Sequence, residues 1–124
     1  MLLRSLAHLA RTRFASRHKS IDGLLIEAAE AMKRPTPEER FAGLNRLLLD
    51  VQYQERREPQ RAVVVQAALL DLILETLEWW ARRDPPMAGT VSKMAPAYED
   101  RRSRIDRGMR FDEEVDAIRS HLRP

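Results

Sequence analysis

Hydrophobic residues recur at intervals of three and four along most of the chain, which is the spacing of one face of an α-helix. No stretch alternates convincingly between apolar and polar residues as a β-strand would. Over residues 2–19 the apolar residues gather on one side of a helical wheel while basic residues occupy most of the other, which predicts a first amphipathic helix. Its apolar side comprises Leu2, Leu3, Leu6, Leu9, Ala10 and Phe14.

Local capping signals mark the beginnings of the next helices. Ser20 is a suitable N-cap for a helix with a buried stripe of Ile21, Leu25, Ala28 and Met32, and Pro35 ends it. In the following segment Thr36 is the predicted N-cap, Pro37 takes the first helical position, and Glu39 completes a capping box. The apolar stripe of this third helix comprises Phe41, Leu44, Leu47, Leu48 and Val51, and the helix fades around residues 54–58.

The fourth predicted helix is the longest, running from Pro59 to about Arg83, where the sequence Asp84-Pro85-Pro86 ends it. Its polar strip is narrow and comprises Asp71, Glu75, Glu78 and Arg82. A helix that is apolar on nearly every other side must be covered. We therefore expect it to be the central helix of a bundle or part of an oligomer interface, with Trp80 in the core.

For the residues after the fourth helix we predict a loop followed by two shorter helices. We expect a loop over residues 85–96, a basic helix over about 97–107 ending at Gly108, and a last helix from Asp112 that buries Val115, Ile118 and Leu122, with Phe111 extending the stripe. The prediction is an all-α, single-domain bundle of five to six helices. Residues 1–84 form its core, and residues 97–124 pack on the same domain.

Composition narrows the function classes. The chain has 124 residues, a net charge of +3 and no cysteine, which excludes disulfides, thiolate zinc sites and cysteine nucleophiles. No apolar run is long enough for a membrane span. Five of the first 20 residues are Lys or Arg, and no acidic residue occurs before Asp22. These observations fit a cytoplasmic protein with its basic surface concentrated at the N-terminus.

The N-terminal segment has several interpretations. An Arg-rich, acid-free amphipathic helix is typical of a mitochondrial presequence, a membrane-surface helix or a phosphate-binding arm. It also fits an ordinary first helix with solvated arginines. We expect it to be a working part of the protein rather than a cleaved targeting segment.

A second basic cluster lies at residues 101–110, where Arg101, Arg104 and Arg107 are spaced along one helical face. Nearby acids could pair with these arginines and leave a merely solvated face. If this helix lies beside the first, the two form a positive groove for a nucleic-acid backbone. The candidate nucleic-acid-binding residues are Arg4, Arg11, Arg13, Arg17, Lys19, Arg101, Arg102, Arg104 and Arg107.

The adjacent tryptophans Trp79 and Trp80 suggest either core packing or a partner contact. Trp79 is placed to stack on Arg83, one turn later. Trp79 and Arg83 are candidate partner-interface residues, but internal packing of this pair explains the spacing better.

Three Glu-x-x-Glu pairs, beginning at Glu27, Glu55 and Glu75, place two carboxylates one turn apart and could hold Mg²⁺. The pattern distantly resembles the all-α nucleotide pyrophosphohydrolases, which implies a metal-bound triphosphate substrate. The chain departs from that family because Ile26 stands where an additional glutamate is usual, and because its Glu113-x-x-Asp116 pair lies far from the first pair. Solvated salt bridges explain these acids as well.

The three histidines do not have the spacing of a metal site or of a catalytic group, and no residue is singled out as catalytic.

The function that fits these patterns best is a non-catalytic small subunit of a nucleoprotein assembly, which contacts an RNA or DNA backbone without sequence specificity and binds other protein subunits. In size, class and charge the chain is similar to the small helical subunits of CRISPR effector complexes, which line a nucleic-acid channel. The alternatives are a protein-interaction adaptor without a nucleic-acid role and the Mg²⁺-dependent hydrolase. We expect no cofactor and no metal site.

Overall fold

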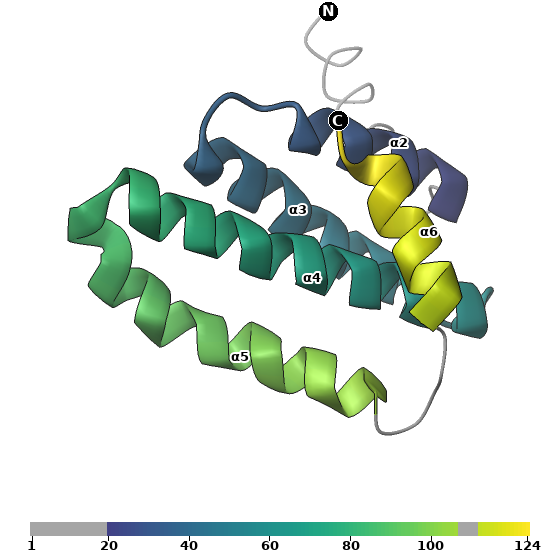
Figure 1. Ribbon diagram of the computed structural model, residues 1–124. Helices are drawn as coiled ribbons and strands as arrows, with labels where there is room; N and C mark the ends of the chain where they lie inside the picture. Colours follow the sequence, from purple (N-terminus) through teal and green to yellow (C-terminus); the bar gives the residue numbers. More distant parts are fainter. Residues whose placement is uncertain (1–19, 107–111) are drawn as a thin grey trace, which may run out of the picture.

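The computed structural model describes residues 20–106 and 112–124, and over these ranges the chain is an all-α bundle without β-strands (Figure 1). The predicted first helix, its basic residues Arg4, Arg11, Arg13, Arg17 and Lys19, and the predicted stop at Gly108 lie outside the described residues. The elements are α2 (Ile21–Met32), α3 (Pro37–Gln52), α4 (Pro59–Arg83), the 3₁₀ turn η1 (Pro85–Met87), α5 (Ala88–Asp106) and α6 (Asp112–Leu122).

The predicted helix starts are confirmed by their caps. Ser20 Oγ accepts a hydrogen bond from the backbone N–H of Gly23 at 3.2 Å, and Thr36 Oγ1 accepts one from that of Glu39, also at 3.2 Å. Each cap satisfies one of the backbone donors that the first turn of a helix leaves without an intrahelical partner. Pro37 and Pro59 occupy first-turn positions, where the missing N–H costs no helical hydrogen bond.

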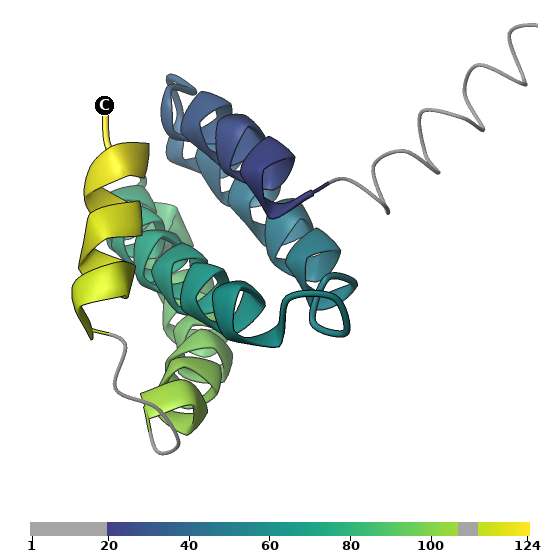
Figure 2. The same ribbon diagram turned by 90° about the vertical axis from the view of Figure 1, so that its right-hand side faces the viewer.

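The long helix α4 is the central element, as predicted. It lies between α3 and α5 in Figure 1, and Figure 2 shows α6 crossing its first half on the side away from the turn between α3 and α4. Its side chains from Ala62 to Leu77 are mostly buried, and they join the stripes of α2 and α3 in one core. Trp80 packs at the margin of this core, with its ring centroid 5.9 Å from that of Phe41.

The apolar surface of α4 is covered within the chain. Among the described residues the large hydrophobic side chains that stay exposed are Ile26 on α2, Leu49 on α3 and Tyr53 directly after α3. Of the two expectations for α4, the central helix of a bundle is confirmed, and among the described residues α4 leaves no large hydrophobic side chain exposed. Three helices pack around α4, and the exposed apolar groups belong to the helical hairpin formed by α2 and α3.

The predicted loop over residues 85–96 is also wrong. A single 3₁₀ turn follows α4, and α5 begins at Ala88 and continues through Pro96. Val91, Met94, Ala95 and Tyr98 form a helically spaced stripe against the core, while Pro96 lies on the exposed side. Burial of that stripe outweighs the hydrogen bond that a proline removes from the helix interior.

The last helix begins at Asp112, as predicted, and packs against the first half of α4. Val115 of α6 joins Val64, Ala67 and Ala68 of α4 in a small second apolar cluster, against which Ile118 packs. Leu122 reaches the main core. The C-terminal residues are thereby part of the same bundle.

Candidate nucleic-acid interface

The three described arginines of the second basic cluster have different roles. Arg102 points to α4, where its Nε donates to Asp71 Oδ1 at 2.8 Å, and both side chains are about one-sixth exposed. Arg119 of α6 donates to the other oxygen of Asp71 at 3.0 Å. Arg102 therefore belongs to an ion pair that joins three helices, and it is not displayed on the surface as a phosphate-binding residue would be.

Arg101 and Arg104 of α5 differ in their exposure. Arg104 is exposed and pairs with Asp100, one turn earlier on the same helix. Arg101 is half-buried close to Tyr98, whose hydroxyl donates to Asn45 Oδ1 of α3 at 2.8 Å. Burial raises the pKa of Tyr98, and the positive charge of Arg101 acts in the opposite direction. Arg101 therefore lies where α5 meets α3. Arg107 lies outside the described residues.

The end of α3 carries further basic residues that the sequence analysis did not single out. Arg46 projects from the outer side of α3, and Arg56 and Arg57 are exposed in the turn that leads to α4. None of the three forms an ion pair within residues 20–106 and 112–124. Their guanidinium groups are thus available to an external anion.

The turn that carries Arg56 and Arg57 lies at the end of the molecule where α2 begins. Asp22, at the start of α2, forms an ion pair with Arg61, near the start of α4. Figure 2 shows the start of α2 and the turn between α3 and α4 on the same side of the molecule, with α6 on the other side. We call Arg46, Arg56, Arg57, Arg101 and Arg104 the basic face. It draws on α3, the turn after α3, and α5, and of these the turn lies at the end of the molecule where α2 follows the five basic side chains of residues 1–19.

One line of side chains along the outer side of α3 combines charge with apolar area. Arg46, Leu49 and Tyr53 follow one another at intervals of three and four residues, which places them on one helical face, and Arg57 is exposed in the turn four residues after Tyr53. The backbone continues in hydrogen-bonded turns past the end of α3, since the N–H of Arg57 donates to the carbonyl of Gln54 at 3.1 Å. Leu49 is 51% exposed and Tyr53 is 61% exposed. We call these four residues the α3 strip.

Trp79 and Arg83, the candidate partner-interface residues, lie at the opposite end of the bundle. The Arg83 guanidinium carbon lies 5.8 Å from the Trp79 ring centroid, so the expected stacking is confirmed, and that of Arg40 lies closer, at 4.5 Å. Both arginines also donate to carbonyls around the turn between α2 and α3, Arg40 to Met32 at 2.7 Å and Arg83 to Pro35 at 3.0 Å. Burial lowers the pKa of Arg40. These contacts hold the turn between α2 and α3 against the end of α4. A partner contact at Trp79 stays a prediction.

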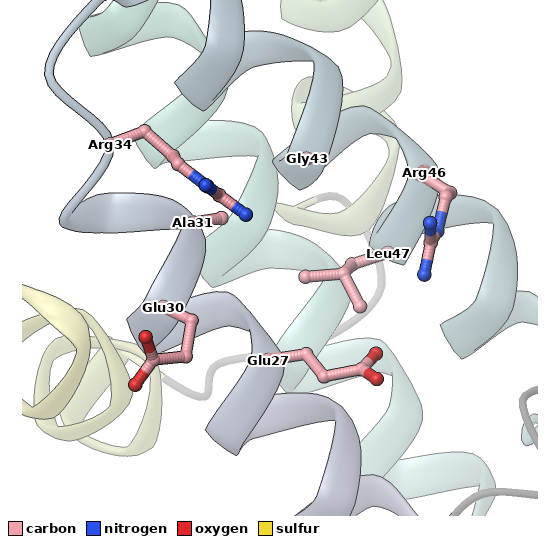
Figure 3. A pocket seen from close by; sticks show the side chains of 7 residues that line it. All are labelled: Glu27, Glu30, Ala31, Arg34, Gly43, Arg46 and Leu47. Atoms are coloured by element: carbon pink, nitrogen blue, oxygen red, sulfur yellow. The ribbon is translucent and has the colours of Figure 1, made fainter.

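The first Glu-x-x-Glu pair lines a shallow cavity of about 240 Å³ between α2 and α3. Figure 3 shows the Glu27 and Glu30 carboxylates pointing in different directions, with Arg34 and Arg46 on the same rim. Within the described residues no group of three or more His, Asp or Glu side chains could hold a metal ion. A carboxylate cage for Mg²⁺ requires convergent oxygens. This site therefore lends no support to the hydrolase alternative.

Comparisons of the chain with protein-family models, with curated proteins and with solved structures give no match. No helix in the described part of the chain is both long enough and apolar enough to cross a membrane.

Proposed function

We propose that the protein is a non-catalytic helical subunit of a nucleoprotein assembly and that it contacts an RNA or DNA backbone without sequence specificity. The contact surface is the basic face, extended by the basic segment 1–19. Arg102 is not included, because its guanidinium group is committed to Asp71.

One observation carries the proposal. Arg46, Arg56 and Arg57 are exposed without ion-pair partners among the described residues, and the turn that holds Arg56 and Arg57 lies at the end of the bundle where α2 begins. Arginine recognises phosphate oxygens through paired N–H donors, and phosphate contacts of this kind supply most of the affinity in sequence-independent binding. In Figure 2 the acidic first turn of α6 lies on the opposite side of the molecule from the α3–α4 turn, and this separation of charge favours the turn as a contact point for a polyanion.

A second candidate function is a protein-interaction adaptor. Ile26 is 67% exposed and Leu49 is 51% exposed, and both project from the α2–α3 hairpin. Exposed aliphatic side chains on a helical hairpin are suited to a helical partner protein. The two functions are compatible in a subunit that binds both neighbouring proteins and nucleic acid.

Binding of the full chain to labelled single-stranded RNA, single-stranded DNA and duplex DNA across a salt series tests the proposal. We expect binding that weakens steeply as salt increases. In the triple variant Arg46→Gln, Arg56→Gln and Arg57→Gln the slope of log K against log salt should decrease by about 2 to 3, since each phosphate contact contributes about 0.7 to 0.9.

The matched control removes the same charge elsewhere, through Lys33→Gln, Arg82→Gln and Lys93→Gln, all of which are exposed. The control variant should retain the wild-type salt slope. An equal loss in both triple variants would show that net charge, rather than the basic face, determines binding. Absence of binding by the wild-type chain at low salt would reject the nucleic-acid function and favour the adaptor.

A further inference from the structure

Tyr53, the exposed tyrosine of the α3 strip, makes no side-chain hydrogen bond or ring contact with the described residues. Tyr53 follows the last residue of α3 and is 61% exposed, whereas the other described aromatic side chains, Phe41, Trp79, Trp80 and Tyr98, are half-buried. Its backbone N–H is satisfied by the carbonyls of Asp50 and Val51, so the local fold depends on the main chain here and not on the ring. An exposed aromatic ring that stabilises nothing locally is available to an external ligand.

The side chains around Tyr53 indicate the chemical class of ligand that fits this surface. Leu49 lies one helical turn before the ring and extends its apolar area, and Arg46 and Arg57 end the strip with positive charge. From Arg46 to Tyr53 the strip extends about 10 Å along the helix axis, at 1.5 Å per residue. Along the chain the strip therefore runs cation, aliphatic group, aromatic ring, cation, and the half-buried Asp50 lies on the same helical face between Leu49 and Tyr53.

We propose that the α3 strip is a base-stacking site for single-stranded nucleic acid. Proteins that bind single strands without sequence preference combine backbone-tracking positive charge with aromatic rings on which unpaired bases stack. In the α3 strip a base stacks on the Tyr53 ring beside Leu49, while Arg46 and Arg57 contact the flanking phosphates. A duplex keeps its bases paired and stacked, so it reaches the arginines but not the ring. This inference rests on the proposed function, and it narrows the substrate class to unpaired strands.

The test uses strands that differ only in their bases. Full-length protein is titrated with a fluorescently labelled single-stranded oligonucleotide, with an abasic oligonucleotide that has the same sugar–phosphate backbone, and with the corresponding duplex, in DNA and, for the normal strand and duplex, in RNA. The wild type should bind the normal single strand at least about fivefold more tightly than the abasic strand. Tyr53→Ala should abolish that difference and leave duplex binding unchanged, and Tyr53→Phe should preserve the difference. Because the Tyr53 side chain is largely exposed, all three proteins should unfold at the same urea concentration.

The two proposals fail in different ways. If the wild type binds normal and abasic strands equally well and with a steep salt slope, the basic face binds backbone but the stacking site is rejected. If Tyr53→Ala weakens duplex and single strand equally, Tyr53 does not discriminate unpaired bases, and the inference is likewise rejected. If no strand binds at low salt, both proposals are wrong.

Discussion

Asp71 of α4 accepts a hydrogen bond from Arg102 of α5, with 2.8 Å between Oδ1 and Nε. The same carboxylate accepts from Arg119 of α6 at 3.0 Å, and all three side chains are largely shielded from solvent. The carboxylate of Asp71 therefore links both α5 and α6 to the central helix α4. Loss of its negative charge removes the shared acceptor of Arg102 and Arg119 in a poorly solvated site, where weakened compensation of a positive charge is costly, although Arg119 keeps its ion pair with Asp116.

We predict that Asp71→Asn lowers the free energy of unfolding by about 2 kcal/mol, less than the ~3–5 kcal/mol typical of a broken, fully buried pair because this site is partly exposed. Urea denaturation at pH 7 measures the loss. Asp100→Asn removes the acid of an exposed pair with Arg104 and should cost no more than about 0.5 kcal/mol. Equal costs in the two variants would contradict a special role for Asp71.

Gly43 is predicted to be necessary for the close approach of α3 to α2. A Cβ added at this position would lie 2.9 Å from the Cβ of Ala31, and neither atom can rotate away. Although alanine favours a helix by about 1 kcal/mol over glycine, we expect Gly43→Ala to destabilise the protein by about 1–2 kcal/mol in thermal unfolding.

Two variants separate this clash from a general effect of the substitution. Gly89 has no atom within 4 Å of its added Cβ, so Gly89→Ala should be neutral or slightly stabilising. Combining Gly43→Ala with Ala31→Gly exchanges the small residue between the helices and should recover part of the stability. Failure of the double variant to recover any stability would mean that the Gly43–Ala31 contact is not the cause.

The cap at Thr36 is predicted to contribute about 1 kcal/mol. Thr36→Ala removes the acceptor for the backbone N–H of Glu39 and leaves that donor without its partner, whereas Thr36→Ser retains a hydroxyl at the same place. Denaturant titration should place the alanine variant well below the wild type and the serine variant close to it. Similar losses in both would attribute the effect to the threonine methyl group instead.

The features that the sequence predicts correctly are those with local causes. The caps at Ser20 and Thr36 and the start of α4 at Pro59 depend on residues within one turn of one another, and all three are confirmed. The helical stretch from Ala88 to Pro96 was missed because its cause is distant in sequence: Val91 packs into a core built by the other helices. Local signals from glycine and proline favoured a loop, and burial outweighed them.

The same distinction applies to the candidate site. The sequence shows three consecutive leucines at 47–49, but only the placement of the neighbouring helices decides that Leu47 and Leu48 point inward and Leu49 outward. Similarly, Arg102 has the spacing of a surface residue, and its partner Asp71 lies 31 positions away. Charge and helical periodicity could predict where basic residues occur, but not which of them are used within the fold.

The ion pair between Asp22 and Arg61 should make stability depend on pH in acid. The hydrogen bond and charge of Arg61 hold the pKa of Asp22 below its ordinary value in the folded protein. The stabilisation is therefore fully present above the unfolded-state pKa of about 3.9, and it is lost as the pH falls through the lower folded-state pKa. We expect wild-type stability to decline more steeply than that of Asp22→Asn as the pH is lowered from about 5 to about 3, so that the two proteins converge. In an Arg61→Gln background the substitution at Asp22 should change this pH dependence little. If the steeper decline persists without Arg61, another cation must perturb Asp22 and the proposed pairing is wrong.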